Sequence, residues 1–401
     1  MQKILKIRRK FSKFKKILSE LSLNMLAFSL LIIAQQLIAF PLISRFTDYN
    51  VFGQIILTFG IGNIIISMLG TTIGTARLLD NKQYNIKYIQ IFLYCSLIII
   101  AISFISYYVF FANNILQSLI FSIVCILGAI RGFLISEYRI ANSHNWIFKQ
   151  NFAYFLGLLI GCLVYYFYKN WLIVFLIPEV VSVTYCLYFL IKEGFLTKFI
   201  DKSELKLGNI IQLMFNNGLS YSLSQYDRFI IYPILGAVKV STYFTVTISS
   251  RMGALIMNPM SNYILGKLSN KRGIDEKTIK GIFLSSIGVI FVYFCIALLM
   301  TPIIVKLLYP SFYSQVHSLL FPVCLGAAIS SANSILKPVI MKSIGIKSFN
   351  KSFILYAIVL IVTSVILGIY NDLFGIALAY IISNFLLFII LCLNLKKSLQ
   401  G

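Results

Sequence analysis

The feature that most constrains this chain is a series of apolar runs, each about 20 residues long, that recur along most of its 401 residues. A helix of that length crosses the roughly 30 Å hydrocarbon core of a bilayer, because it rises about 1.5 Å per residue. Hydrophobic residues make up 59% of the chain, whereas soluble domains contain roughly 45–50%. The sequence therefore predicts an all-α polytopic membrane protein.

The apolar runs predict about twelve transmembrane helices. The expected spans are 22–44, 51–74, 88–111, 115–136, 151–168, 171–191, 209–235, 240–264, 281–305, 315–341, 352–370 and 373–394. The expected divisions are a basic cytoplasmic N-terminal segment 1–21, an N-lobe 22–191, a cytoplasmic connector 192–208, a C-lobe 209–394 and a cytoplasmic C-terminus 395–401. The stretches FPLISRFTDYNVFGQIILT and YPILGAVKVSTYFTVTISS are weakly similar when Pro41 is aligned with Pro233. This similarity suggests duplicated six-helix lobes around a central cavity.

Lysine and arginine are distributed in the way that sets orientation in a membrane. If the N-terminus is cytoplasmic, 27 of the 35 Lys and Arg residues lie in cytoplasmic segments. The outside loops hold only Arg45, Lys169, Lys239 and Lys306. Because cytoplasmic loops carry an excess of Lys and Arg, both termini are predicted to be inside. We attribute the net charge of +23 to this topology and to an N-terminal anchor, MQKILKIRRKFSKFKK, on anionic membrane lipids, and not to nucleic acid binding.

Residue types suited to metal binding or covalent catalysis are sparse. The seven cysteines lie in or beside apolar runs without a CxxC pair, and there are only two histidines. The sequence has no GxxxxGK[ST] phosphate loop and no GxSxG motif. The predicted outside loops are too short to hold a catalytic domain. We therefore expect a transporter and not an enzyme, without metal or cofactor, with a proton or sodium gradient, the membrane potential or product consumption as candidate driving forces.

Polar residues recur at helical spacing inside several predicted spans. In span 209–235 the polar stripe consists of Gln212, Asn216, Ser220, Ser224 and Asp227. In span 240–264 it consists of Thr247, Arg251, Asn258 and Asn262. At about 100° per residue, the members of each set share one helix face. Since hydrocarbon offers no hydrogen-bond partners, such faces must contact protein or water, and we expect them to line a polar cavity.

The charges within or near the predicted membrane region are mostly positive. The candidate substrate-binding residues are Arg77, Arg131, Arg228, Arg251 and Lys337. Guanidinium groups suit phosphate because they present paired N–H donors, so the cavity favours an anionic substrate such as a phosphate or pyrophosphate. Glu179 and Asp227 are candidates for ion coupling. Structural roles stay open: Arg131 and Lys337 could reach the cytoplasmic surface, and Glu179 could pair with an arginine.

Three stretches in order along the chain, FPLISRFTDYNVFGQ, DRFIIYPILGAVKVSTYFTV and LLYPSFYSQVHSLLFPVCLGAAI, resemble bacterial polysaccharide flippases of the Wzx kind. These flippases belong to the multidrug/oligosaccharidyl-lipid/polysaccharide exporter (MOP) superfamily. The resemblance implies translocation of undecaprenyl-pyrophosphate-linked oligosaccharides to the outer leaflet of the bacterial inner membrane by alternating access, for O-antigen or capsule synthesis. It implies that Arg131, Arg228 and Arg251 correspond to cavity cations, and Asp227 to an acidic residue common at that junction. A polysaccharide polymerase is a further candidate partner.

Two other functions compete with this interpretation. A drug or cation antiporter of the same superfamily would need carboxylates in the membrane, and this chain offers few. A polysaccharide polymerase or ligase would need a large outside loop, which the predicted topology does not provide. Relatives that flip peptidoglycan precursor resemble fourteen-helix proteins, and the additional helix pair has no room in this sequence.

Overall fold

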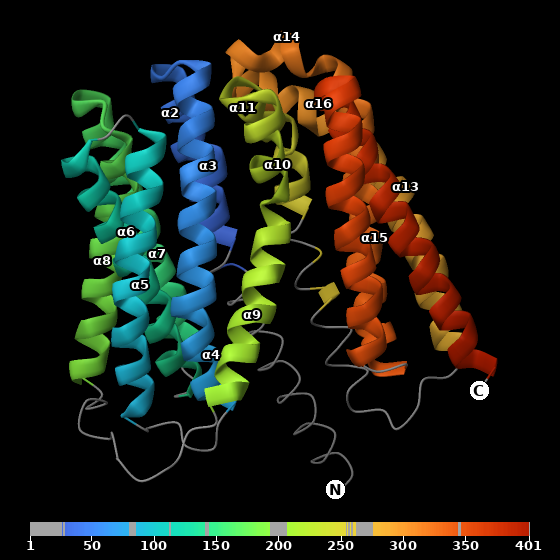
Figure 1. Cartoon of the computed structure of the whole chain (residues 1–401), viewed down its shortest axis with the longest axis horizontal. Coiled ribbons are helices and arrows are strands. Elements are labelled where there is room, and N and C mark those ends of the chain that lie inside the picture. Colours follow the sequence, from blue (N-terminus) through green and yellow to red (C-terminus); the bar gives the residue numbers. More distant parts are fainter. Residues whose placement is uncertain are drawn as a thin grey trace, which may run out of the picture. The chain divides into compact units, whose positions relative to one another are not determined.

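The computed structural model describes residues 26, 29–79, 86–111, 114–140, 144–192, 207–253, 255, 257, 260–261, 276–343 and 346–400 (Figure 1). Within these residues the ordered elements are helices, and none of them is a strand. The all-α prediction is therefore confirmed. The predicted segments 1–21 and 193–206 lie outside the described residues, as do the candidate residues Asn258 and Asn262.

The chain divides into two compact units. Unit 1 consists of Met1–Ile43 and Thr58–Ser224, and unit 2 of Ser44–Leu57 and Gln225–Gly401. The boundary between the compact units lies after Ser224. The sequence-based division into lobes at 192–208 stays a prediction. Unit 2 also includes a short piece of the first half of the chain.

Unit 1 is built from the helices of the first half and one more. Its elements are η1 (Ala34–Ala39), the start of α2 (Phe40–Phe46), the end of α3 (Tyr49–Ile65), η2 (Ile66–Thr71), α4 (Thr72–Leu79), α5 (Lys87–Phe110), α6 (Ile115–Ile140), α7 (His144–Tyr168), α8 (Trp171–Lys192) and α9 (Leu207–Ser224). The segments η1 and η2 are single stretches of π-helix within longer helices. Such π segments interrupt the regular hydrogen-bond ladder and frequently occur at functional sites.

Unit 2 contains the remaining elements. They are α10 (Tyr226–Leu235), α11 (Ala237–Val246), α13 (Glu276–Leu308), η4 (Pro310–Phe312), α14 (Tyr313–Val316), η5 (His317–Leu319), α15 (Leu320–Ser343) and α16 (Ile346–Gln400), with the end of α2 and the start of α3. Helix α16 is two helices joined at a tight turn, because Asn371 and Asp372 have non-helical backbone angles. That turn lies where the sequence separates spans 352–370 and 373–394.

Nine stretches among the described residues are long and apolar enough to cross a bilayer. One of them, Phe349–Leu395, contains both of the last two predicted spans. Predicted spans 88–111 and 171–191 match α5 and α8 to within a residue at each end. Spans 209–235 and 240–264 are not among the nine. Gln225 breaks the first into shorter helices, and Thr247 breaks the second, part of which lies outside the described residues. The chain is thus a multi-span membrane protein whose seventh and eighth spans are discontinuous.

The core of unit 1 brings aromatic side chains from three helices together. Phe40, Phe59 and Phe175 lie with ring centroids 4.7 to 5.6 Å apart. Helices α7 and α8 approach closely at Gly161, where a Cβ atom would lie 2.9 Å from the carbonyl oxygen of Val174. Small residues allow such close approach in membrane helices, where dispersion contacts replace the hydrophobic driving force.

Helix α9 belongs to unit 1 because it contacts α4 and η2. The Nδ2 group of Asn217 donates to the Thr72 hydroxyl over 2.9 Å. Next to it, a Cβ atom at Gly218 would lie 2.9 Å from the Met68 sulfur. These contacts account for the position of the unit boundary after Ser224.

The core of unit 2 is organised around the start of α3. Phe52 is fully buried and contacts the rings of Phe244, Tyr309 and Phe312. At the next residue, a Cβ atom at Gly53 would lie only 1.9 Å from the carbonyl oxygen of Ala237, so glycine is required there for α3 and α11 to meet. This packing anchors the Ser44–Leu57 segment in unit 2.

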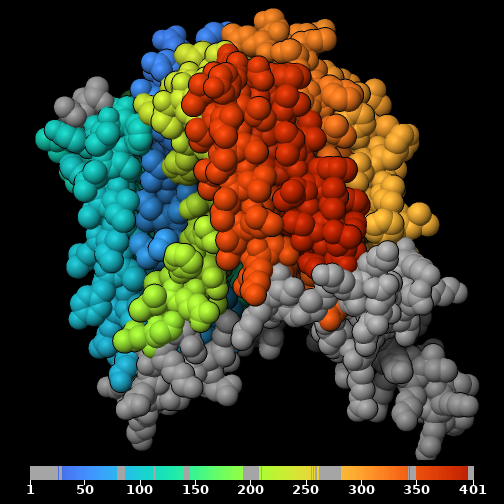
Figure 2. Space-filling view, turned by 45° about the vertical axis from the view of Figure 1, so that its right-hand side comes forward, coloured from blue at the N-terminus to red at the C-terminus, as the bar shows by residue number. Residues whose placement is uncertain are grey.

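The outward surfaces of the long helices are apolar. Figure 2 shows α16 along one face of unit 2. Its exposed side chains include Ile354, Leu355, Ile358, Ile361, Val362, Ile366 and Ile369. Helix α5 of unit 1 is similar, with Leu93, Leu97 and Ile105 exposed. Apolar surface of this extent is expected on helices that face lipid.

Candidate functional site

Two predicted cations of unit 2 lie beside one aromatic ring. The guanidinium carbon of Arg228 is 5.3 Å from the centroid of the Phe244 ring, and that of Arg251 is 3.7 Å from it. Cations are attracted to the faces of aromatic rings, more strongly where water is excluded. We call Asp227, Arg228, Phe244, Thr247 and Arg251 the arginine cluster.

The break in span 240–264 positions Arg251. Thr247 ends α11 with backbone angles of −80° and 7°, outside the regular helix. The Nη1 group of Arg251 donates to the carbonyl oxygen of Phe244 over 3.1 Å, and its Nη2 group donates to the Thr247 hydroxyl over 2.7 Å. Carbonyl groups near the end of a helix lack partners within it, and here a side chain supplies one. The predicted proximity of Thr247 and Arg251 on one helix face is confirmed.

The break in span 209–235 positions Asp227 and Arg228. Gln225 precedes α10 with backbone angles of −117° and 11°, so both charged residues occupy the first turn of α10. Asp227 is favourably placed there because a helix N-terminus carries partial positive charge. Arg228 is only 4% exposed, and its Nη1 group donates to the carbonyl oxygen of Ile56 over 3.2 Å. Its Nε group has no hydrogen-bond partner among the described residues.

The arginine cluster has a net positive charge, although it includes the carboxylate of Asp227. Arg228 and Arg251 are close enough to repel each other electrostatically, and Asp227 is close enough to attract both. Two guanidinium groups and one carboxylate leave an excess of positive charge. The arrangement can therefore bind an anion, and the most suitable anions present several oxygen atoms to the N–H groups.

The same break at Gln225 interrupts the predicted polar stripe. Gln212, Asn216, Ser220 and Ser224 remain on one face of α9 and are all exposed. Asp227, which the periodicity placed at the centre of that stripe, lies on α10 beyond the break. The helical-wheel position assigned to Asp227 assumed a continuous helix, which the break at Gln225 interrupts. Its role in lining a cavity stays a prediction.

The predicted cations of unit 1 are buried in ion pairs. Arg131 binds Glu179 through two hydrogen bonds, from Nε over 2.8 Å and from Nη2 over 2.9 Å, and its guanidinium carbon lies 4.9 Å from the centroid of the Tyr154 ring. Arg77 is fully buried and pairs with Glu137 over 2.5 Å. Of the two roles considered for Glu179, the structure shows pairing with an arginine, while ion coupling stays a prediction.

Lys337 lies on α15 of unit 2 and belongs neither to the arginine cluster nor to a buried ion pair. Its side chain is exposed, and its Nζ atom lies 5.3 Å from the ring centroid of Phe349 and 5.9 Å from that of Phe353. Its role in substrate binding stays a prediction, as do the roles of Arg77 and Arg131.

The sequence did not indicate Glu137 or Phe244. Glu137 lies six residues after Arg131 on α6 and is 2% exposed. It lies one residue beyond predicted span 115–136, so the sequence did not signal a costly carboxylate in the membrane, although α6 continues past it. Phe244 is one of 34 phenylalanines, and nothing in the sequence distinguishes it from those that face lipid. Among the described residues no group of three His, Cys, Asp or Glu side chains could hold a metal ion.

Comparisons with known proteins identify the fold. No protein-family model and no curated protein matches the chain. Solved structures do match, and they include a multidrug resistance MATE family transporter of the MOP superfamily in an inward-facing conformation. It has a TM-score of 0.70 and 11% identity over 94% of this chain and 99% of that chain.

Two further solved structures share this fold. The lipid II flippase MurJ, in an inward closed conformation, has a TM-score of 0.68 and 15% identity over 93% of this chain and 87% of its own. The eukaryotic MATE transporter AtDTX14 has a TM-score of 0.61 and 13% identity over 96% of this chain and 98% of its own. At these identities the likeness concerns the fold, which is that of the MATE and MurJ transporters.

Proposed function

We propose that this protein is a flippase that moves undecaprenyl-pyrophosphate-linked oligosaccharide repeat units from the cytoplasmic to the periplasmic leaflet of a bacterial inner membrane. It would do so by alternating access, for O-antigen or capsular polysaccharide synthesis. The observation that carries this proposal is the arginine cluster, in which Arg228 and Arg251 lie beside one ring with a single carboxylate near them.

The chemistry of the cluster suits a pyrophosphate. Two nearby guanidinium groups repel each other, and an anion between or beside them relieves that repulsion. A pyrophosphate offers several oxygens, so it can accept paired N–H donors from more than one arginine. The fold is shared with MurJ, a lipid II flippase, which supports a lipid-linked substrate. The resemblance of the sequence to Wzx-type flippases supports an oligosaccharide repeat unit.

A drug antiporter is the competing function, since MATE transporters share the same fold. A cationic drug would need an accessible carboxylate that is not already neutralised by a cation. Glu137 and Glu179 are each engaged by an arginine, and Asp227 lies near two of them. These contacts favour an anionic substrate. Asp227 and Glu179 remain our candidates if transport is coupled to a proton or sodium gradient.

The test uses a strain that lacks the gene. We expect complete undecaprenyl-linked repeat units to accumulate facing the cytoplasm, and to be cleared when the gene is restored. Units already on the outer face would instead indicate a polymerase or ligase. Normal lipid pools with altered sensitivity to cationic drugs would indicate an antiporter.

The arginine cluster is tested by substitution in the complemented strain, at equal abundance of protein in the membrane. Arg251→Ala removes two charge-assisted donors, so we expect polysaccharide export to fall about 10-fold or more. Arg251→Lys keeps the charge and should retain more export than Arg251→Ala. Lys306→Ala, which removes an exposed cation at the end of α13, is the matched control. Full export by Arg251→Ala would exclude Arg251 as a substrate contact.

A further inference from the structure

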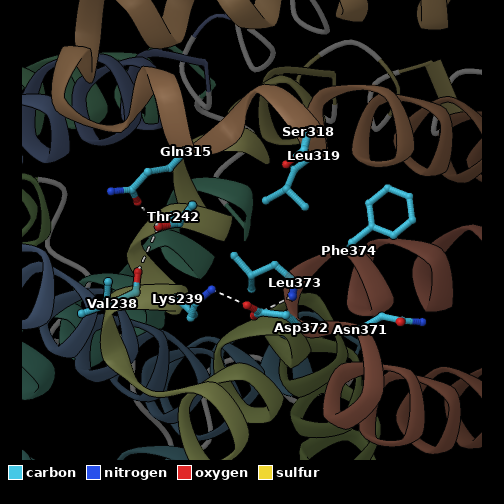
Figure 3. A pocket seen from close by; sticks show the side chains of 10 residues that line it. All are labelled: Val238, Lys239, Thr242, Gln315, Ser318, Leu319, Asn371, Asp372, Leu373 and Phe374. Atoms are coloured by element: carbon cyan, nitrogen blue, oxygen red, sulfur yellow. Dashed lines mark hydrogen bonds and ion pairs between the residues drawn. The ribbon is translucent and has the colours of Figure 1, made fainter.

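A second polar site lies at one end of unit 2, separate from the arginine cluster. A cavity of about 430 Å³ opens where the start of α11, the η5 segment and the internal turn of α16 meet. Figure 3 shows Lys239 facing Asp372 across it, and Gln315 facing Thr242. Its volume lies within the range of ligand-binding pockets, roughly 300–1,000 Å³. All of its lining residues belong to unit 2.

The polar groups of this cavity are mostly uncharged. Gln315 and Asn371 present exposed amides and Ser318 an exposed hydroxyl, so each can interact with a ligand hydroxyl. The Thr242 hydroxyl is buried and holds Gln315 in place through a hydrogen bond. The two charged residues, Lys239 and Asp372, form an ion pair with each other. The lining therefore has no excess charge, and it provides no reason for a phosphate to bind. A neutral ligand rich in hydroxyl groups matches it better.

The remaining lining is apolar and forms a surface beside these polar groups. Leu319, Leu373 and Phe374 contribute side chains to it. Sugar rings present hydroxyl groups at their edges and C–H groups on their faces. A lining that combines amides, hydroxyls and an aromatic ring is complementary to both. This combination selects a saccharide over a simple ion or an apolar drug.

The turn that supplies Asp372 has an unusual backbone conformation. Asp372 has a φ of 54° and a ψ of −144°, a region that side chains other than glycine rarely adopt. Its carboxylate accepts a hydrogen bond from the Leu373 amide over 2.8 Å and forms an ion pair with Lys239. The side chains of Lys239 and Asp372 are each about half exposed. Exposed ion pairs stabilise proteins little. The carboxylate nevertheless joins the turn of α16 to the start of α11 across the cavity.

We propose that this cavity, lined by Lys239, Thr242, Gln315, Ser318, Asn371 and Asp372, is a saccharide-binding site at the outer end of unit 2. The predicted topology places Lys239, Asn371 and Asp372 in outside loops, and it places Thr242, Gln315 and Ser318 at the outer ends of spans 240–264 and 315–341, where a translocated repeat unit would arrive. The choice of saccharide as ligand rests in part on the proposed function. The existence of the site rests on the cavity and the side chains around it.

The experiment measures binding of free saccharides to the purified full-length protein in lipid nanodiscs by calorimetry. The probes are a panel of hexoses, N-acetylhexosamines and 6-deoxyhexoses, with inorganic pyrophosphate titrated separately. We expect binding of at least one sugar class at millimolar concentration. Gln315→Ala and Asn371→Ala should each weaken that binding about 10-fold, as loss of a hydrogen bond to a ligand does. Ser314→Ala, an exposed neighbour outside the cavity, should bind like the wild type.

Two results would overturn the proposal. One is absence of binding by every sugar in the panel, and the other is binding that Gln315→Ala and Asn371→Ala both leave unchanged. If the protein binds a saccharide but does not clear cytoplasmic lipid-linked units in the complemented strain, the saccharide site stands and the proposed flippase function is wrong. Loss of pyrophosphate binding in Arg251→Ala with saccharide binding intact would show that the two sites are independent.

Discussion

Breaking the Arg131–Glu179 pair should destabilise the protein strongly, whereas removing both charges should not. Glu179 is 5% exposed and Arg131 is 15% exposed, and two hydrogen bonds join them. Removing one partner of such a pair leaves a buried charge without compensation, which costs about 3–5 kcal/mol. Glu179→Gln leaves Arg131 next to Tyr154 and partly reachable by water, so we expect the lower end, about 3 kcal/mol. Arg131→Met leaves a more deeply buried carboxylate and should cost at least as much.

The double variant Arg131→Met/Glu179→Leu provides the decisive comparison. Replacing both members of a buried pair by apolar residues is often neutral or stabilising by about 1–4 kcal/mol. The double-mutant cycle uses Arg131→Met and Glu179→Leu as its single variants, each expected to cost about 3 kcal/mol or more, and a near-neutral double variant. It should therefore give a coupling energy of about 6 kcal/mol in magnitude, beyond the range of about 0.2–1 kcal/mol for exposed pairs. The free energies of unfolding would be measured by denaturant titration of the purified protein in lipid nanodiscs.

The same variants separate a structural role from a functional one. If each single variant costs less than about 1 kcal/mol, the reasoning from burial is refuted. If the double variant is stable and exports polysaccharide normally, Arg131 is not a substrate contact and Glu179 is not an ion-coupling group. If it is stable but inactive, at least one of the two charges takes part in transport.

Two further predictions follow from close packing and from topology. Gly53→Ala should destabilise the protein by about 1–3 kcal/mol, because its Cβ atom would collide with the Ala237 carbonyl. Gly288→Ala, in an open position on α13, should stabilise the protein by about 0.5–1 kcal/mol. Equal thermal unfolding midpoints for the two variants would contradict this reasoning. Ser318→Cys should react with a membrane-impermeant maleimide in intact cells, because the predicted topology places this exposed residue at the outer end of span 315–341. Labelling only after permeabilisation would reverse the predicted orientation.

The regular spans were predictable because bilayer thickness fixes the length of an apolar run. The ends of α5 and α8 follow directly from it. The breaks at Gln225 and Thr247 were not predictable in this way, since neither position holds a proline or glycine and both surrounding runs read as continuous helices. The periodicity argument for Asp227 depended on a continuous helix, which the break interrupts, whereas Thr247 and Arg251 do lie in contact as it predicted.

The candidate site was predictable in its residue types but not in its pairing. Arg131 and Glu179 are 48 residues apart, and the sequence offered pairing and ion coupling as alternatives without a means of choosing. Arg228 and Arg251 were identified as unusual because charges inside membrane spans are costly. That they share the ring of Phe244 depends on how α10 and α11 pack, which the one-dimensional pattern does not contain.

The assignment of Ser44–Leu57 to unit 2 has a consequence for biosynthesis. This segment leaves the ribosome early, yet Phe52 and Gly53 complete their packing only when Ala237, Phe244 and Phe312 have been made. Unit 2 therefore cannot fold as an autonomous C-terminal fragment, although domains generally fold as units during synthesis. If the chain were divided within the 192–208 segment and its two halves expressed separately, they would assemble only if Ser44–Leu57 of the N-terminal half packed into unit 2 of the C-terminal half. Truncated chains that end before α10 would leave it without its partners, as a target for membrane quality-control proteases.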